Sequence, residues 1–206
     1  SINMLYGGAA TGARVITSTS SPGWSLMQEG MSCLANAELP CVIVLVQRAG
    51  PGQGTTRHGQ TDYNSVTRGG GHGGYKNIVL APASVQENAD LIQLAFHLAD
   101  KYRNPVIVLT DAIIGQMAEP LDIRPLELDP LPPKDWAIGG KRRHSDRQRR
   151  IISCGQGQVP IEPYTQYLYL MQALDKKYKE MAANEVRYES YRTEDAHLAI
   201  VAFGSM

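Results

Sequence analysis

The chain has 206 residues, of which 43% are hydrophobic, and its 20 lysines and arginines balance 20 aspartates and glutamates. Because the net charge is zero, no nucleic-acid or membrane partner is expected. No stretch approaches the roughly 18 apolar residues of a membrane span, and the first residues lack the basic and apolar regions of a secretion signal. These features favour a soluble, cytoplasmic protein with one large core.

The cysteines and histidines have no metal-binding pattern. Cys33, Cys41 and Cys154 form no C-x-x-C pair, and the five histidines lack the H-x3-5-H spacing of zinc ligands. We therefore expect no metal site and no iron–sulfur cluster in this chain, and three reduced thiols in a cytoplasmic compartment.

Short apolar runs alternate with helical patterns along most of the chain. The runs are rich in β-branched residues and lack polar alternation, as is typical of parallel strands covered on both faces: 14–19, 41–47, 77–81, 105–110 and 197–203. The pattern from Val85 to Tyr102 predicts a helix, with Ser84 as its N-cap and Glu87 completing a capping box. The fold class expected is α/β, a doubly wound and mostly parallel sheet with helices on both faces.

Composition divides the chain into four parts. Residues 1–120 are expected to form the core domain, and 121–163 a proline-rich, basic excursion that extends over a neighbour. Residues 164–192 are tyrosine-rich and predict an interface helix, while 193–206 resemble the start of a following α/β domain that is cut short. The first residues have helical spacing without a preceding turn, as if the chain began inside a helix.

The basic run at 141–150 has six cations in ten residues. It lacks the interleaved aromatic residues that nucleic-acid binding favours and includes an aspartate, so a solvated loop is the preferred interpretation.

Two strand ends carry residues suited to binding. The first strand leads into Ser20, Ser21, Pro22 and Gly23 ahead of a helix, where hydroxyl groups could bind an anion or a cofactor edge, or could simply cap the helix. The second strand ends at Arg48, whose planar guanidinium could grip a carboxylate or phosphate, or could form a surface ion pair.

Nine of the 20 glycines fall between Gly50 and Gly74, in a long loop beside the second strand end. The loop also carries polar residues that could supply acid, base or charge: Arg57, His58, Gln60, Asp62 and Arg68. The sequence contains no Walker A motif, no dinucleotide fingerprint at a strand end and no G-x-S-x-G elbow, which disfavours NTPases, simple dehydrogenases and serine hydrolases.

Seven motifs in order resemble the α subunit of 2-oxoacid:ferredoxin oxidoreductases, and most closely the 2-ketoisovalerate (3-methyl-2-oxobutanoate) branch. They cover nearly the whole chain and begin at residues 6, 17, 37, 47, 67, 81 and 99: Y-G-G-A-A-T-G, T-S-T-S-S-P-G, A-E-L-P, Q-R-A-G-P-G, T-R-G-G-G-H-G, A-P-A-S-V-Q-E and A-D-K-Y-R-N-P.

The resemblance implies a pyrimidine-type thiamine-diphosphate domain that shares its cofactor with a β subunit, which would hold the diphosphate and magnesium. The implied reaction is oxidative decarboxylation of a 2-oxoacid with coenzyme A, sending electrons through iron–sulfur clusters on another subunit to ferredoxin. Arg48 matches the arginine that grips the substrate carboxylate, and Ser20, Ser21, Pro22 and Gly23 match the loop that lines the active site. A homo-oligomer is also expected.

Relatives also carry a glutamate that hydrogen-bonds the aminopyrimidine, in a stretch upstream of the one that matches Ser1. No glutamate of this chain is assigned to that role, so activity is expected only in complex. Two alternatives stay open: an enzyme for 2-oxoglutarate or pyruvate, with Arg57, His58 or Arg68 as partner of a distal carboxylate, and a non-catalytic dimerisation fragment.

Overall fold

A computed structural model describes residues 1–138, 152 and 163–206, with the side chains of 163–166 left out. The basic run 141–150 and Cys154 lie outside the described residues. Four parallel strands form one sheet in the order β1-β2-β4-β3: β1 (Ile16–Ser20), β2 (Cys41–Gln47), β3 (Ile78–Leu80) and β4 (Pro105–Asp111). The sheet confirms four of the five predicted strands.

The two central strands are the apolar runs with the most β-branched residues. Every residue of β4 is buried, and five of the seven residues of β2 are. Seven consecutive residue pairs join the two strands, from Cys41 with Pro105 to Gln47 with Asp111. A strand buried on both faces has no need of polar alternation, which explains why these runs are continuously apolar.

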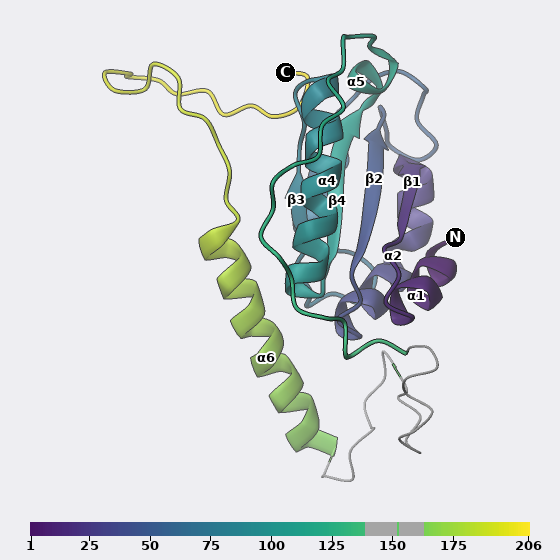
Figure 1. Cartoon of the computed structure of the whole chain (residues 1–206). Helices are drawn as coiled ribbons and strands as arrows, with labels where there is room; N and C mark the ends of the chain where they lie inside the picture. Colours follow the sequence, from purple (N-terminus) through teal and green to yellow (C-terminus); the bar gives the residue numbers. More distant parts are fainter. Residues whose placement is uncertain (139–151, 153–162) are drawn as a thin grey trace.

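Helices cover both faces of the sheet, as the doubly wound class requires. The helices α1 (Ile2–Ala10) and α2 (Ser21–Asn36) pack on one face, and α4 (Val85–Tyr102) packs on the other (Figure 1). Trp24 and Met31 of α2 are almost fully buried on the first face, and Leu98 of α4 is on the second.

The predicted start of α4 is confirmed in detail. The Ser84 hydroxyl accepts the Glu87 backbone N–H at 3.1 Å, and the Glu87 carboxylate accepts the N–H of Ala83 at 2.7 Å. The two bonds satisfy two backbone donors at the helix start, and Glu87 reaches the residue before the N-cap instead of the N-cap itself.

The described part of the 121–163 segment is extended and runs along α4 of the same chain. The Gln86 amide donates to the Asp122 carbonyl and accepts its N–H, at 3.1 and 2.9 Å. Further along α4, the Gln93 amide donates to the carbonyl of Arg124 and accepts the N–H of Leu126. The two glutamines thus supply the backbone hydrogen bonds that an extended segment lacks when it has no partner strand.

Residues 197–203 do not form the predicted fifth strand. Leu198, Ile200 and Val201 are all more than four-fifths exposed, and the segment pairs with neither edge of the sheet. An apolar, β-branched run has strand propensity, but a strand needs a neighbour that accepts its backbone hydrogen bonds, and this run has none in the described chain.

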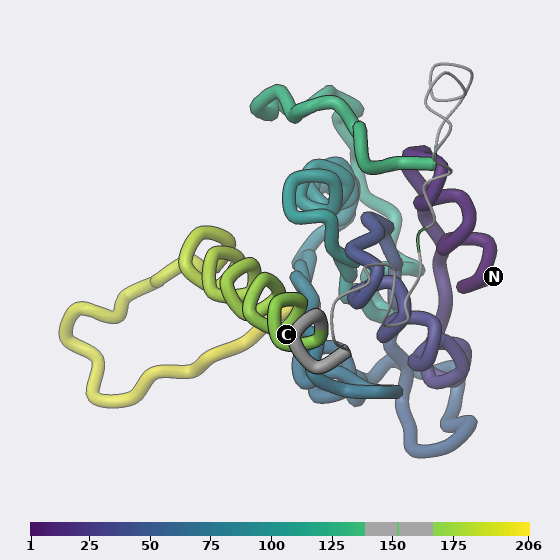
Figure 2. Tube along the Cα trace, turned by 90° about the horizontal axis from the view of Figure 1, so that it is seen from below, coloured from purple at the N-terminus to yellow at the C-terminus, as the bar shows by residue number. Residues whose placement is uncertain are grey.

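The tyrosine-rich helix α6 (Pro163–Asn184) ends eight residues before the predicted boundary at 192. Figure 2 shows it at the side of the sheet away from α1. Met181 and Tyr178 pack against the core formed with α4, and Leu174 is also buried. Tyr167, Leu168 and Tyr169 are exposed on its described first part.

Glu185, just after α6, fastens the end of this helix to α4. Its carboxylate accepts hydrogen bonds from Lys101 and Tyr102 at 2.8 and 2.7 Å, and Arg187 lies within 2.8 Å. Burial raises the pKa of the Glu185 carboxyl, but the hydrogen bonds from these three residues outweigh burial and lower that pKa to about 2.

Glu185→Gln should destabilise the fold at neutral pH and have no effect near pH 2. A carboxyl whose pKa is depressed by folding contributes stability above its unfolded pKa of about 4.3, and this contribution is lost as pH falls towards 2. Because the Lys101 side chain is 41% exposed, solvent screens the pair and we expect only about 1–2 kcal/mol at pH 7. Urea unfolding of the wild type and the variant between pH 7 and pH 3 measures the difference in their free energies of unfolding. Glu180→Gln, at an exposed position of α6, is the control; a Glu185→Gln deficit independent of pH would contradict the assignment.

Candidate functional site

The carboxyl ends of β1, β2 and β4 meet at one edge of the sheet, at the top of Figure 1. The crossover from β1 to β2 and the crossover from β3 to β4 run in opposite directions, through α2 and α4 on opposite faces. The strand order therefore reverses between β2 and β4. In open α/β sheets, ligands bind at such a switch point.

A cavity of about 310 Å³ opens at this switch point. Residues from three strand ends line it: Ser20, Val46, Gln47, Arg48, Thr56, Ala112, Gly115 and Gln116. The structure thus brings together Ser20 and Arg48, which the sequence singled out at separate strand ends.

Two residues that line this cavity each have one side-chain polar atom that is buried without a partner. Neither the Ser20 hydroxyl nor the Arg48 Nε has a hydrogen-bond partner among the described residues. The other side of the guanidinium is held, because Arg48 Nη2 donates to the Gln53 carbonyl at 2.6 Å. Buried donors are normally satisfied, so a hydroxyl and a guanidinium N–H that are left open favour an oxygen-bearing ligand.

Ser21, Pro22 and Gly23 form the first turn of α2. They belong to the helix that they were expected to precede: β1 passes directly into α2, whose first residues are Ser21 and Pro22. None of the three lines either of the two cavities at this edge. A Cβ at Gly23 would lie 2.1 Å from the Thr19 hydroxyl, so glycine lets the first helical turn fold back onto the strand.

The Ser21 hydroxyl joins the strand end of Arg48 to the glycine-rich loop. It donates to the Asp62 carboxylate at 2.5 Å and accepts the backbone N–H of Arg48 at 3.2 Å. The Gln47 side chain, 1% exposed, accepts the Asp62 N–H at 3.2 Å. Ser21 and Asp62 therefore fix the position of Arg48 without facing the cavity.

Ser21→Ala should lower the free energy of unfolding by about 1–3 kcal/mol, because it leaves the Arg48 N–H and the Asp62 carboxylate without their partner. Ser25→Ala removes a neighbouring hydroxyl that only donates to the Ser21 carbonyl at an exposed position, and should cost less than about 0.5 kcal/mol. Chemical denaturation of both variants measures the difference. Equal stabilities would mean that the Ser21 hydroxyl does not hold the junction.

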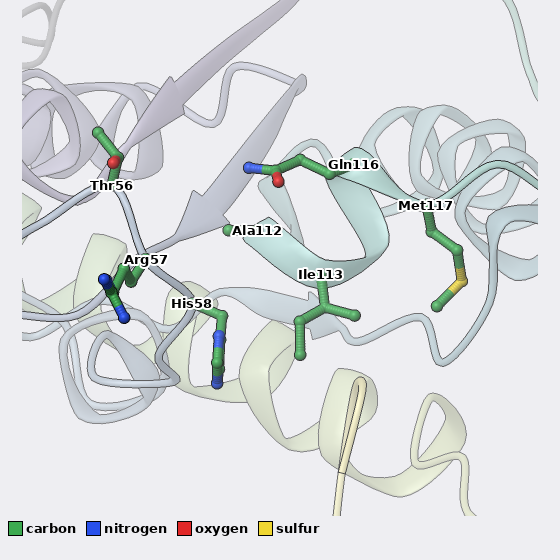
Figure 3. A pocket seen from close by; sticks show the side chains of 7 residues that line it. All are labelled: Thr56, Arg57, His58, Ala112, Ile113, Gln116 and Met117. Atoms are coloured by element: carbon green, nitrogen blue, oxygen red, sulfur yellow. The ribbon is translucent and has the colours of Figure 1, made fainter.

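A larger cavity of about 570 Å³ adjoins the first and shares Thr56, Ala112 and Gln116 with it. Arg57 and His58 come from the loop, and Ala112, Ile113 and Gln116 come from α5 (Ala112–Gln116); Figure 3 shows the two groups on opposite sides of this cavity. Arg68 is elsewhere: it lies after α3 (Tyr63–Thr67), where its Nε donates to Asn64. Of the three cations considered for a distal carboxylate, Arg57 and His58 border the site and Arg68 does not.

The residues of α5 were missed from the sequence, although they follow a predicted strand. Asp111 ends β4 and caps α5, because its carboxylate accepts the N–H groups of Ile113 and Ile114 at 2.9 and 3.1 Å. The predicted strand that ends at 110 has a polar residue just after it, as the strands that end at 19 and 47 do. An aspartate before a short helical turn is also an N-cap signature.

Asp111 also ties the last residues of the chain to this edge. Its carboxylate accepts hydrogen bonds from Ser205 and Gln60, and the Gln60 amide also donates to the Phe203 carbonyl. Burial raises the pKa of the Asp111 carboxyl, but the hydrogen bonds from Ser205, α5 and Gln60 outweigh burial and lower it. A carboxylate satisfied in this way positions α5 and is not free to act as a base.

Within the described ranges, no group of three or more histidine, cysteine, aspartate or glutamate residues is arranged to hold a metal ion. Among the same residues, no helix is long and apolar enough to cross a membrane.

Residues 1–197 match the family model described as "Pyruvate flavodoxin/ferredoxin oxidoreductase, thiamine diP-bdg". The chain therefore belongs to this family of thiamine-diphosphate-binding domains, in agreement with the resemblance found in the sequence and with the parallel α/β sheet.

Individual relatives are named as subunits of 2-oxoacid oxidoreductases. The chain is 51% identical over 98% of its length to "Ketoisovalerate oxidoreductase subunit VorB" of Methanothermobacter marburgensis, and 36% identical over its whole length to "2-oxoglutarate synthase subunit KorA" of Archaeoglobus fulgidus. It spans about half of these relatives, 55% and 57% of their lengths.

A solved structure shares the fold. The 2-oxoglutarate:ferredoxin oxidoreductase from Magnetococcus marinus, with 2-oxoglutarate, coenzyme A and succinyl-CoA bound, superposes with a TM-score of 0.67 at 25% sequence identity. The match covers 91% of this chain and 36% of that one.

Proposed function

We propose that the chain supplies the pyrimidine-binding part of a thiamine-diphosphate-dependent 2-oxoacid:ferredoxin oxidoreductase, which converts 3-methyl-2-oxobutanoate to an acyl-CoA. The observation that carries the proposal is the cavity at the switch point, which is lined by Ser20 and Arg48, two residues whose side chains each hold a buried atom with no hydrogen-bond partner among the described residues. Family membership and the 51% identity to a ketoisovalerate oxidoreductase subunit support it.

The residues present fit one end of the cofactor. The Ser20 hydroxyl can donate to or accept from a ring nitrogen or an amino group, and it is buried and unpartnered. The proposal assigns the diphosphate and magnesium to a partner β subunit. Thiamine diphosphate, when bound, supplies the electron sink for the carbon that loses carbon dioxide.

Arg48 would bind the carboxylate of the 2-oxoacid. The Nη2 bond to the Gln53 carbonyl holds the side chain, and the bond from the backbone N–H to the Ser21 hydroxyl holds the main chain. The buried Nε has no hydrogen-bond partner among the described residues. A preorganised guanidinium orients a carboxylate through charge-assisted hydrogen bonds, and this fixes the neighbouring carbonyl carbon for reaction.

In the assembled enzyme, Arg48→Lys should lower kcat/KM about ten- to a hundredfold, because an ammonium replaces a planar two-pronged donor. This loss corresponds to about 1.5–3 kcal/mol of transition-state stabilisation. Cofactor binding should change less. Arg57→Lys is the matched control and should change kcat/KM for 3-methyl-2-oxobutanoate by less than about threefold. Unchanged kinetics in Arg48→Ala would remove Arg48 from the site.

The proposed substrate has a branched, apolar side chain. Val46, Ala112 and Gly115 contribute an apolar wall to the cavity that holds Arg48. Arg48 is the one cation among the described residues that line this cavity, so a distal carboxylate there would be desolvated without a second cationic partner. One observation favours the 2-oxoglutarate alternative: Arg57 and His58 border the adjoining cavity, and a long substrate could reach them.

Steady-state kinetics of the assembled enzyme separate the two substrates. We predict a higher kcat/KM for 3-methyl-2-oxobutanoate than for 2-oxoglutarate, with relaxed selectivity among branched acids, because one methylene is worth only about 1–3 kcal/mol. The reverse order would show the substrate to be wrong and would assign the distal carboxylate to Arg57 and His58.

The proposal includes further partners: an iron–sulfur subunit, ferredoxin as electron acceptor, coenzyme A, and a second copy in a cytoplasmic homo-oligomer. The exposed residues Tyr167, Leu168 and Tyr169 of α6 support subunit contacts, since monomers rarely leave such clusters uncovered. The alternative, a non-catalytic dimerisation fragment, gives no reason for a cavity at the switch point that is lined by both Ser20 and Arg48.

A further inference from the structure

Gly115 occupies a position at which the fold has no need of glycine. It lies inside the short helix α5, and its backbone is not in the left-handed region that favours glycine. A Cβ built at this position would meet only the Val46 side chain, at 3.5 Å, which is an ordinary van der Waals contact. Since alanine stabilises a helix relative to glycine, neither backbone nor packing explains the choice.

The cavity does explain it. Gly115 and Val46 both line the 310 Å³ cavity that holds Ser20 and Arg48. The missing side chain would project from α5 towards β2, into the space beside Val46. A methyl at this position would narrow that space, and a branched side chain would fill it.

We propose that Gly115 is a specificity-determining residue, which leaves room for the branch of the 2-oxoacid side chain beside Val46 while Arg48 holds the carboxylate. This inference rests on the proposed function and adds the residue that sets the width of the substrate pocket. Ala112, the other small residue of this wall, already carries a methyl and comes from the first position of α5.

The test compares two substrates that differ by one branch methyl, 3-methyl-2-oxobutanoate and 2-oxobutanoate, in the assembled enzyme. The measured ratio is kcat/KM for 3-methyl-2-oxobutanoate divided by kcat/KM for 2-oxobutanoate. It should fall about tenfold in Gly115→Ala and further in Gly115→Val, because an apolar pocket discriminates one methyl group by roughly 10- to 200-fold. The branched acid should also weaken as a competitive inhibitor of 2-oxobutanoate turnover.

Gly7→Ala is the matched control, since Gly7 lies inside α1, is exposed and would have no atom within 4 Å of an added Cβ. It should leave the substrate ratio unchanged. Both alanine variants should melt at or above the wild-type temperature, which separates a change of pocket from a loss of fold.

The outcomes distinguish a failure of the role of Gly115 from a failure of the proposed function. Equal losses on both substrates, or an unchanged ratio in the folded Gly115→Ala and Gly115→Val variants, would overturn the role of Gly115 and leave the proposed function intact. A wild-type assembly that turns over neither acid nor any other 2-oxoacid would overturn both.

Discussion

The hydrogen bonds of the Ser21 hydroxyl are the constraint on which the site depends. Through this one oxygen, the first residue of α2 is bound to the backbone of Arg48 and to the carboxylate of Asp62. The ends of β1 and β2 and the glycine-rich loop are therefore fixed relative to one another. The Gln47 side chain, which accepts the Asp62 N–H, and the Thr61 hydroxyl, which donates to the Arg48 carbonyl, add to this junction and hold the glycine-rich loop against the sheet.

The same edge of the sheet is closed from the other side by Asp111. Its carboxylate caps α5 and receives Gln60 from the loop and Ser205 from the end of the chain. Both acidic side chains thus serve as anchors. Ser20 and Arg48, which line the cavity, each keep a buried side-chain atom without a hydrogen-bond partner among the described residues. Positioning and binding are therefore divided between different residues of one strand edge.

The sequence predicts well those elements whose signals are local. The strands at 41–47 and 105–110 and the capped helix at 85–102 follow from apolar runs and a capping box, and all three are confirmed. The run at 197–203 has the same local signal but no partner strand, and pairing cannot be read from one segment. The helix start at Ser21 was missed because a serine, proline and glycine together also predict a turn.

Parallel topology accounts for most of what could be predicted of the site. Because parallel strands bring their carboxyl ends together, Ser20 and Arg48 could be paired before the structure was known. The sequence could not show which of the two serines lines the cavity, because adjacent residues at a strand–helix junction point in different directions. In the structure, Ser20 lines the cavity and the Ser21 hydroxyl donates to Asp62. The α5 residues of the cavity wall follow the end of β4. Because β3 comes between β2 and β4 in the sequence, the pairing of β4 with β2 is not apparent from the order of the strands along the chain.

A structure of the assembled enzyme with thiamine diphosphate and 3-methyl-2-oxobutanoate would test the central claim most directly. We predict that the substrate carboxylate contacts the Arg48 guanidinium and that its branched side chain lies beside Val46 and α5. Density for the substrate at another part of the assembly, with the cavity between Ser20 and Arg48 filled only by water, would contradict the account.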